Sequence, residues 1–327
     1  MPILEEPGPT DSMIETRDLR RTFKSRSGPV EAVRGVDLQV RPGEIFGFLG
    51  PNGAGKTTTL RMLATLIVPT GGEATVAGAD LRRQPELVRQ RIGYVAQSGG
   101  TDPAVTGREE LVLQGRLYGL DAKTARARAA ELLTTVELDE AADRATATYS
   151  GGMRRRLDVA LGLVHRPRLL FLDEPTTGLD PQARAHLWDE VRALRAGGTT
   201  VFMTTHYLDE ADALCARVAI IDHGTIVAEG TPDALKRDVA GEVVTLGVDG
   251  SSDLVRQLVE RQPYVREAVA EEGTVRLYVD RGETALPALL RLLDGAGLAP
   301  KTIALARPSL DDVFLRQTGR SLRDEAA

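Results

Sequence analysis

The sequence has 327 residues, of which 42% are hydrophobic, and its 47 acidic and 41 basic side chains give a net charge of −6. This length favours two domains over one, and the acidic balance argues against a protein that coats nucleic acid, so we expect no nucleic-acid partner. The single cysteine, Cys215, excludes an intrachain disulfide. No apolar run approaches the roughly 18 residues of a membrane-spanning helix, and the N-terminal stretch MPILEEPGPTDSM shows no signal-peptide pattern.

Most of the chain alternates short apolar runs with helical patterns, which is typical of an α/β domain. We place this domain at residues 13–238, after a tail at residues 1–12 that is expected to be disordered. Buried strands are predicted at 44–50, 93–97, 168–174, 199–205 and 217–223. Residues 98–150 read as helices, beginning with the capping-box pair Thr106 and Glu109, and predict a helical subdomain inserted into the α/β domain.

A second unit is predicted at residues 241–319, followed by a tail at residues 320–327. Its apolar patterns run strand, helix, strand, strand, helix, strand, which is typical of a small ferredoxin-like α+β domain. The segment SLDDVFLRQTG, at 309–319, predicts a closing helix. This unit carries no recognisable chemical motif, and we hypothesise that it stabilises a dimer.

The stretch GPNGAGKT, at 50–57, satisfies the phosphate-loop pattern, follows a predicted strand and starts a helical pattern. Backbone N–H groups in such a loop surround phosphate oxygens, and the helix N-terminus adds partial positive charge. Lys56 would reach the β- and γ-phosphates, and the Thr57 hydroxyl would bind Mg²⁺. The alternative is a glycine-rich turn before a helix. We expect ATP to contact Gly50, Pro51, Asn52, Gly53, Ala54, Gly55, Lys56, Thr57 and Thr58.

The stretch LLFLDEP, at 169–175, is an apolar strand that ends in two acids. Asp173 fits the acid that phosphate-loop enzymes place near Mg²⁺ on a neighbouring strand. Glu174 would act as the general base that activates the attacking water. The alternative is an ordinary strand end with solvated acids at the surface.

Two further polar residues end predicted strands. Gln97 could contact both the metal and the attacking water, and His206 could contact the γ-phosphate if its strand lies beside the phosphate loop. Taken alone, a polar residue or a histidine at a strand end is more often structural, and that alternative stays open. The four histidines and one cysteine form no pattern typical of a zinc site.

The segment YSGGMRRRLDVA, at 149–160, places a Ser-Gly-Gly triplet at the entrance of a helix. The glycines indicate that the backbone closely approaches another group. We interpret Arg154, Arg155 and Arg156 as a solvated or salt-bridged basic flank of this helix; the alternatives are a nucleic-acid patch and proximity to phosphate or lipid headgroups.

Taken in order, GPNGAGKT, Gln97, SGG, LDEP, GLD and His206 resemble the nucleotide-binding subunit of ABC transporters over residues 13–238. The segments YSGGMRRRLDVA, TTHYLDEAD and LDDVF resemble the daunorubicin/doxorubicin-resistance exporter branch, which extends the resemblance over most of the chain. The resemblance implies a phosphate-loop ATPase fold. It also implies a homodimer in which each ATP lies between one copy's phosphate loop and the other copy's Ser150, Gly151 and Gly152.

Further roles follow from the same resemblance. Asp180, in the GLD segment, corresponds to the family's D-loop, and Phe23 lies where the family stacks an aromatic ring on adenine. Tyr149 and Met153 depart from the family's Leu-Ser-Gly-Gly-Gln, and methionine cannot donate a hydrogen bond. Capture of the second subunit's ATP would therefore depend on Ser150 and the backbone of the two glycines.

The implied function is ATP hydrolysis that drives a membrane exporter, with a hydrophobic drug or antibiotic as cargo. The subunit would bind peripherally at the cytoplasmic face of the membrane. Its partner would be a separately encoded integral membrane permease that docks on residues 98–148. Two alternatives remain: a non-transport ABC ATPase with a mechanical role in DNA repair or translation, and a degenerate regulatory subunit that binds ATP without hydrolysing it.

Overall fold

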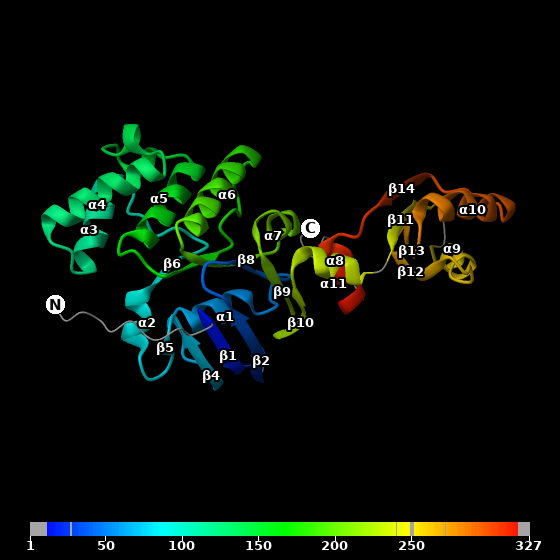
Figure 1. The fold of residues 1–327 in the computed structure, drawn as a ribbon, viewed down its shortest axis with the longest axis horizontal. Coiled ribbons are helices and arrows are strands. Elements are labelled where there is room, and N and C mark those ends of the chain that lie inside the picture. Colours follow the sequence, from blue (N-terminus) through cyan, green and yellow to red (C-terminus); the bar gives the residue numbers. More distant parts are fainter. Residues whose placement is uncertain (1–11, 27, 240, 249–251, 272, 320–327) are drawn as a thin grey trace. The chain divides into compact units, whose positions relative to one another are not determined.

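The computed structural model describes residues 12–26, 28–239, 241–248, 252–271 and 273–319 (Figure 1). The predicted tails, 1–12 and 320–327, lie outside the described residues apart from Ser12. The chain divides into two compact units, Met1–Glu229 and Gly230–Ala327. None of the helices described is long and apolar enough to cross a membrane.

A six-stranded sheet in the order β10-β9-β3-β8-β7-β6 forms the centre of the first unit. The pairs β3–β8, β3–β9, β6–β7 and β7–β8 are parallel. Its members are β3 (Ile45–Leu49), β6 (Ile92–Val95), β7 (Leu169–Asp173), β8 (Thr200–Thr205), β9 (Arg217–Asp222) and β10 (Thr225–Gly230). The first five are the predicted strands; their near-continuous apolar runs suit a parallel sheet that is buried on both faces.

A second, antiparallel sheet in the order β2-β1-β4-β5 was not predicted from the sequence. It consists of β1 (Ile14–Ser25), β2 (Gly28–Val40), β4 (Gly71–Val76) and β5 (Ala79–Asp80). One hydrophobic cluster joins the two sheets, because Ile14, Val36 and Val76 belong to the same buried core as Phe46 and Phe202. This core fixes β3, and hence the loop that follows it.

The helices of the first unit are labelled in Figure 1. They are α1 (Lys56–Leu63), α2 (Pro85–Arg91), α3 (Gly107–Leu117), α4 (Ala122–Thr135), the short η1 (Asp139–Ala141) and η2 (Thr146–Thr148), α5 (Gly151–Leu163), α6 (Pro181–Ala196) and α7 (Leu208–Leu214). The predicted helical insertion contains α3, α4, η1 and η2, and α5 begins directly after it. Thr106 and Glu109 form the predicted capping box of α3.

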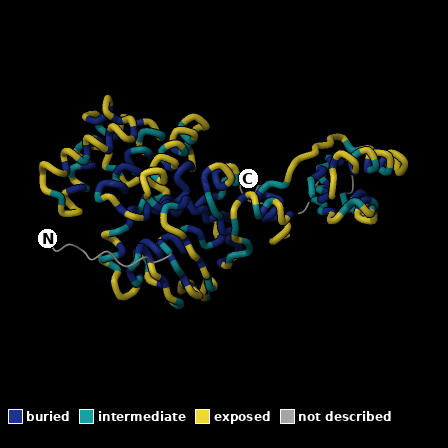
Figure 2. Tube along the Cα trace, viewed as in Figure 1, coloured by how far each residue is buried: buried dark blue, intermediate teal, exposed yellow. Residues whose placement is uncertain are grey.

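The second unit has the predicted ferredoxin-like order of elements: β11 (Glu242–Gly247), α9 (Ser252–Val259), β12 (Val265–Glu271), β13 (Thr274–Val279), α10 (Gly282–Gly295) and β14 (Thr302–Ala306). The sheet order is β12-β13-β11-β14, and the three strand pairs are antiparallel. Val255 on α9 and Leu289 on α10 pack into the same core as Leu277 on β13. The sheet and its two helices thus form one small hydrophobic core (Figure 2).

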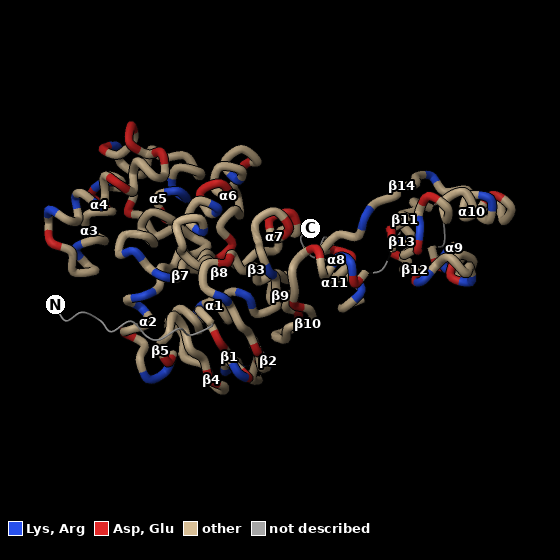
Figure 3. The backbone as a smooth tube through the Cα atoms, viewed as in Figure 1, with Lys and Arg blue, Asp and Glu red and all other residues tan. Residues whose placement is uncertain are grey.

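Two more helices, α8 (Pro232–Asp238) and α11 (Leu310–Thr318), contact each other in this unit. Arg276 on β13 lies 3.1 Å from the Asp311 carboxylate, and the Tyr278 hydroxyl donates a 3.2 Å hydrogen bond to Asp312. The closing helix is therefore held on the sheet by buried polar contacts. Acidic and basic residues are interspersed along both units (Figure 3).

Candidate active site

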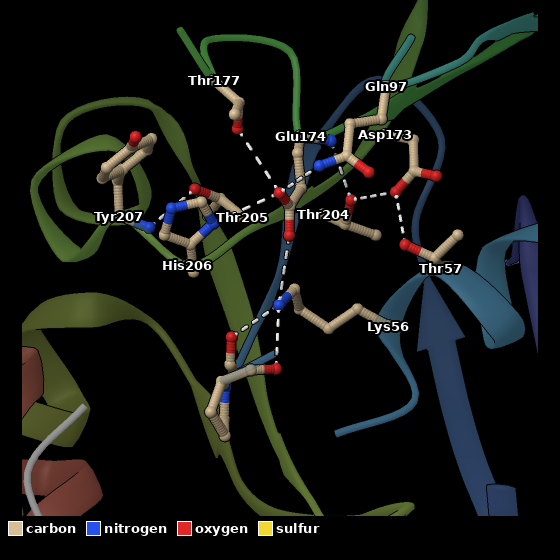
Figure 4. Close-up of polar contacts among 12 residues, drawn as sticks. Lys56, Thr57, Gln97, Asp173, Glu174, Thr177, Thr204, Thr205, His206 and Tyr207 are labelled. Atoms are coloured by element: carbon tan, nitrogen blue, oxygen red, sulfur yellow. Dashed lines mark hydrogen bonds and ion pairs between the residues drawn. The ribbon is translucent and has the colours of Figure 1, made fainter. Parts of the chain in front are cut away.

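Four adjacent parallel strands bring the predicted motifs together. Because β8 lies between β3 and β7, and β6 follows β7, the carboxyl ends of these strands meet at one edge of the sheet. The phosphate loop follows β3, and His206 follows β8. Asp173 ends β7 and Glu174 comes directly after it, and Gln97 follows β6 (Figure 4). His206 was expected to contact the γ-phosphate only if its strand lies beside the phosphate loop. Leu49 on β3 pairs with Thr205 on β8, so the strand does lie there.

The phosphate loop depends on glycine at two positions. Gly55, at the N-terminus of α1, has φ of 108°, which is a left-handed conformation that other residues rarely adopt. A Cβ atom on Gly50 would lie 2.3 Å from the carbonyl oxygen of Ile221 on β9, so a side chain would not fit there. The loop thus delivers the first backbone N–H groups of α1 to the strand edge, which is the arrangement that binds phosphate.

Lys56 lies almost fully buried at the start of α1, and its Nζ donates to the carbonyls of Gly50 at 2.7 Å and Pro51 at 3.0 Å. The same Nζ lies 3.3 Å from Oε1 of Glu174. Burial lowers the pKa of Lys56, and the neighbouring Glu174 carboxylate opposes that shift. The ammonium is therefore held between the phosphate loop and the end of β7.

The side chains of the site converge on the Glu174 carboxylate (Figure 4). Its Oε2 accepts hydrogen bonds from Gln97 Nε2 at 2.9 Å and Thr177 Oγ1 at 3.4 Å, and lies 3.3 Å from His206 Nδ1. The contacts with His206 and then Lys56 hold the pKa of Glu174 at about 2, against the effect of burial. The carboxylate is thus ionised near neutral pH, as a proton acceptor must be.

The backbone of Glu174 is also unusual. Its φ of 44° lies in the left-handed region. Its backbone N–H donates a 2.9 Å hydrogen bond to Thr204 Oγ1 on β8. A non-glycine residue in this conformation is strained, and such strain gathers at functional sites where the surroundings impose it. The turn directs the carboxylate toward Lys56 and His206.

Asp173 and Thr57 fit a Mg²⁺ ion. Thr57 Oγ1 donates to Asp173 Oδ1 at 3.0 Å, and Thr204 Oγ1 donates to the same oxygen at 2.7 Å. The other oxygen, Oδ2, is buried and has no hydrogen-bond partner among the described residues. Across those residues no cluster of three or more His, Cys, Asp or Glu side chains could hold a metal by itself. One carboxylate and one hydroxyl suit Mg²⁺, which takes its other ligands from water and substrate phosphates.

The predicted signature and D-loop residues form a second group. Ser150 caps α5 by accepting from the Met153 N–H at 3.2 Å, and Asp180 caps α6 by accepting from the Ala183 N–H at 2.8 Å. Ser150, Gly152 and Asp180 line one cavity of about 250 Å³. Gly151 lines another, of about 440 Å³, together with Gln97. The N-terminus of α5 therefore lies beside Asp180 at the start of α6.

Phe23 lies on β1 with 36% of its surface exposed. The guanidinium of Arg21 lies 4.5 Å from the centre of its ring, in a cation–π contact. The ring is thus accessible for stacking, with one contact already made by Arg21.

Several contributors to the site were missed from the sequence. Thr204 and Thr177 were not singled out, since threonine within an apolar strand or a loop carries no distinguishing signal. The expectation of a solvated flank is wrong for Arg155, which is 7% exposed, although it lies 4.0 Å from the Asp158 carboxylate; Arg154 is exposed and Arg156 half-buried. Helical spacing could have found this, because Arg155 precedes Val159 and Leu163 at intervals of four and shares their buried stripe.

Behind His206, a buried carboxyl joins α7 to α6. Glu210 has 0% exposed surface, and its Oε1 accepts a 3.2 Å hydrogen bond from Nε1 of Trp188 on α6. Burial raises the pKa of Glu210. Tyr207, next to His206, packs under the guanidinium of Arg184 at 4.6 Å from the ring centre. The segment that carries His206 is therefore anchored to α6, the helix that Asp180 caps.

Comparison with known proteins decides the family. Residues 33–177 match the family model described as ABC transporter, and residues 230–318 match the C-terminal domain of DrrA1-3-like ATP-binding proteins. The daunorubicin resistance ATP-binding protein DrrA2 of Streptomyces coeruleorubidus is 47% identical over 93% of this chain and 96% of its own length. The chain belongs to the ABC transporter family of ATP-binding proteins. As an ABC ATPase, it binds ATP and hydrolyses it.

Other similar proteins support this assignment. The daunorubicin/doxorubicin resistance ATP-binding protein DrrA of Streptomyces peucetius is 46% identical, covering 96% of this ABC ATPase and 94% of the relative. The Nod factor export ATP-binding protein I of Paraburkholderia xenovorans is 41% identical over 96% of this chain and 99% of its own length. A solved ATP-binding cassette, dimeric and bound to ADP and Pi in a post-hydrolysis state, matches with a TM-score of 0.62 and 27% identity over 67% of this chain and 98% of that one.

Proposed function

We infer that this ABC ATPase powers the export of a hydrophobic drug or antibiotic through a membrane permease. The observation that supports hydrolysis is the convergence of Lys56, Gln97 and His206 on the Glu174 carboxylate, beside Asp173. Drug export is supported by two relatives that are named as daunorubicin and daunorubicin/doxorubicin resistance ATP-binding proteins. The C-terminal match to the same branch, over residues 230–318, extends this support to the second unit.

In the proposed mechanism, Lys56 and the backbone of residues 50–58 bind the ATP phosphates. Thr57, Asp173 and Gln97 would hold Mg²⁺, which would supply positive charge near the phosphates. Glu174 accepts the proton of the attacking water, because its carboxylate is ionised and faces the phosphate loop. Gln97 and His206 orient that water and contact the γ-phosphate, and Phe23 stacks on adenine.

The second group of residues serves a second copy of the chain. We place two copies head to tail, with Ser150, Gly151 and Gly152 of one copy against the ATP held by the other. The N-terminus of α5, a helix of 13 residues, offers partial positive charge and backbone N–H groups to the γ-phosphate. The dimeric state of a similar solved cassette supports this arrangement. Asp180 would contact the same interface.

The remaining assignments concern the partner and the domains. The membrane partner is a separately encoded integral permease, and the ATPase docks on it peripherally at the cytoplasmic face through residues 98–148. This proposal draws support from the export names of the relatives. Residues 13–238 act as the ATP-binding domain and residues 241–319 as an accessory αβ domain that stabilises the dimer.

Drug efflux from cells tests the proposal. The chain is isolated from its native membranes, and the multi-helix membrane protein that co-purifies is expressed with it in a drug-sensitive host. We expect lower daunorubicin accumulation only when both proteins are present, and none of this effect with Glu174→Gln. Undiminished efflux with Glu174→Gln, in a variant shown to have lost ATP hydrolysis, would rule out ATP-driven export by this subunit.

A further inference from the structure

Arg155 is the one arginine of YSGGMRRRLDVA that lies in the protein interior, with 7% of its surface exposed. Its guanidinium donates to three main-chain carbonyls: Ala96 at 2.6 Å, Pro175 at 2.7 Å and Asp173 at 3.2 Å. A guanidinium is planar and carries five N–H donors in a fixed fork, so three such bonds define its position and that of its acceptors.

The three acceptors lie next to the residues on which hydrolysis depends. Ala96 directly precedes Gln97, while Asp173 and Pro175 stand on either side of Glu174. Arg155 itself lies on α5, in the second turn after the Ser150 cap. One side chain therefore connects three segments that are far apart in the sequence: the end of β6, the end of β7 and the signature helix.

A second residue of α5 faces the same loop. Asp158, which follows Arg155 by one turn, comes so close to the segment after Gln97 that a Cβ atom on Gly99 would lie 2.6 Å from its Oδ2. Asp158 lies 4.0 Å from the Arg155 guanidinium. The face of α5 that carries Arg155 is thus packed against residues 96–99.

The hydrogen bonds from Arg155 lie on either side of the strained backbone of Glu174. Its φ of 44° must be imposed by the surroundings, and Arg155 binds the carbonyls of both neighbouring residues. We propose that Arg155 is a positioning residue, which fixes the main chain around Glu174 and Gln97 relative to the signature helix and thereby sets the rate of ATP hydrolysis. This inference rests on the proposed roles of Glu174 and Gln97.

Arg155→Lys tests the inference in the full-length chain. Lysine keeps the charge and much of the apolar stem but offers a single ammonium, which cannot serve three separate carbonyls in one fixed geometry. We expect kcat for ATP hydrolysis to fall at least ~10-fold, because small displacements of catalytic groups are costly. KM and the Kd for ATP should stay within about threefold, because the phosphate loop keeps its own contacts.

Arg128→Lys is the matched control. Arg128 on α4 donates to the carbonyls of Val164 at 3.2 Å and Leu163 at 2.8 Å, at the other end of α5. It therefore holds the same helix by the same chemistry, away from Gln97 and Glu174. We expect its kcat to remain within about twofold of wild type. Thermal unfolding and circular dichroism of both variants confirm that the compared proteins are folded.

A double-mutant cycle separates positioning from general loss of packing. If Arg155 acts through Glu174, adding Arg155→Lys to Glu174→Gln should lower kcat by less than about twofold further. A folded Arg155→Lys variant with wild-type kcat would overturn the inference, as would an equal loss in Arg128→Lys or full additivity in the cycle. Failure of the proposed function looks different, because Glu174→Gln alone would then keep wild-type turnover.

Discussion

The ammonium of Lys56 lies 3.3 Å from the carboxylate of Glu174, so the phosphate loop and the proposed general base form an ion pair. Gln97 and His206 approach the same carboxylate from the other side. The groups proposed to contact the γ-phosphate thus all face a negatively charged side chain in this structure. A bound nucleotide would have to replace these contacts with its own. Substitutions of Lys56 and Glu174 are therefore informative tests of the site.

Removing the Lys56 side chain tests the phosphate loop. Lys56→Ala should weaken ATP binding at least ~10-fold, since hydrogen bonds to charged groups contribute about 1.5–3 kcal/mol. Isothermal titration with ATP and Mg²⁺ measures the change. The control is Lys123→Ala, which removes an exposed lysine at the start of α4. Equal ATP affinity in Lys56→Ala and wild type would contradict the phosphate-loop assignment.

Removing the charge of Glu174 tests the general base. Glu174→Gln preserves shape, so ATP should still bind, while kcat should fall by about 100-fold or more because the proton acceptor is lost. Phosphate release under saturating ATP measures kcat. Asp209→Asn, at an exposed acid just beyond His206, should leave turnover unchanged. Wild-type turnover in Glu174→Gln would exclude the general-base role.

The central sheet and its motifs were predictable because each strand is a short apolar run that ends in a polar motif. β3, β7 and β8 each bury all of their residues, as is typical of parallel strands that are covered on both faces. The antiparallel sheet was missed because β1, IETRDLRRTFKS, mixes charged residues with apolar ones and its register shifts against β2. Such irregular strands lack the strict alternation on which prediction depends.

In the site, too, some features were predictable from the sequence and others depend on the fold. Sequence motifs predicted Lys56, Asp173 and Glu174 as site residues. They could not show that Lys56 and Glu174 pair, because that contact depends on the order of strands in the sheet. Nor could they show the left-handed backbone of Glu174, a conformation that glutamate rarely adopts. Burial of Arg155 was predictable from helical periodicity, whereas its three acceptors lie at the ends of β6 and β7, which only the fold brings together.

Ser150→Ala tests the proposed half-site. The hydroxyl caps α5 and would contact the partner copy's ATP, so turnover at saturating ATP should fall, while ATP binding to one copy should be unchanged. The matched control is Thr231→Ala, which removes the N-cap of α8 and costs a similar ~1 kcal/mol of stability. If both variants lose turnover equally, or neither does, the half-site assignment is wrong. Measuring turnover as a function of protein concentration shows whether hydrolysis depends on dimer formation.

Glu190, on α6, predicts a pH dependence of stability. Burial raises its pKa from 4.5 to about 7, and its Oε2 is buried without a partner among the described residues. Between these values the folded state keeps a proton that the unfolded state has lost, so the free energy of unfolding falls as pH rises through this window. Glu190→Gln should therefore be more stable than wild type above pH 7, with the difference shrinking toward pH 4.5.

Urea unfolding of wild type and Glu190→Gln at several pH values measures this difference. Asp189→Asn, at the exposed neighbouring position on the same helix, should show no such trend. A stability difference between wild type and Glu190→Gln that is independent of pH would contradict the prediction.

The hydrogen bond between Trp188 and the buried Glu210 has a practical consequence. Trp188 is the only tryptophan in the sequence, and its indole touches the helix that follows His206. Its ultraviolet emission therefore originates from a single, known place, where a small movement of that helix alters the indole's surroundings. The unlabelled wild-type protein thus carries an intrinsic optical probe, with which nucleotide arrival and departure could be followed on the timescale of stopped-flow mixing.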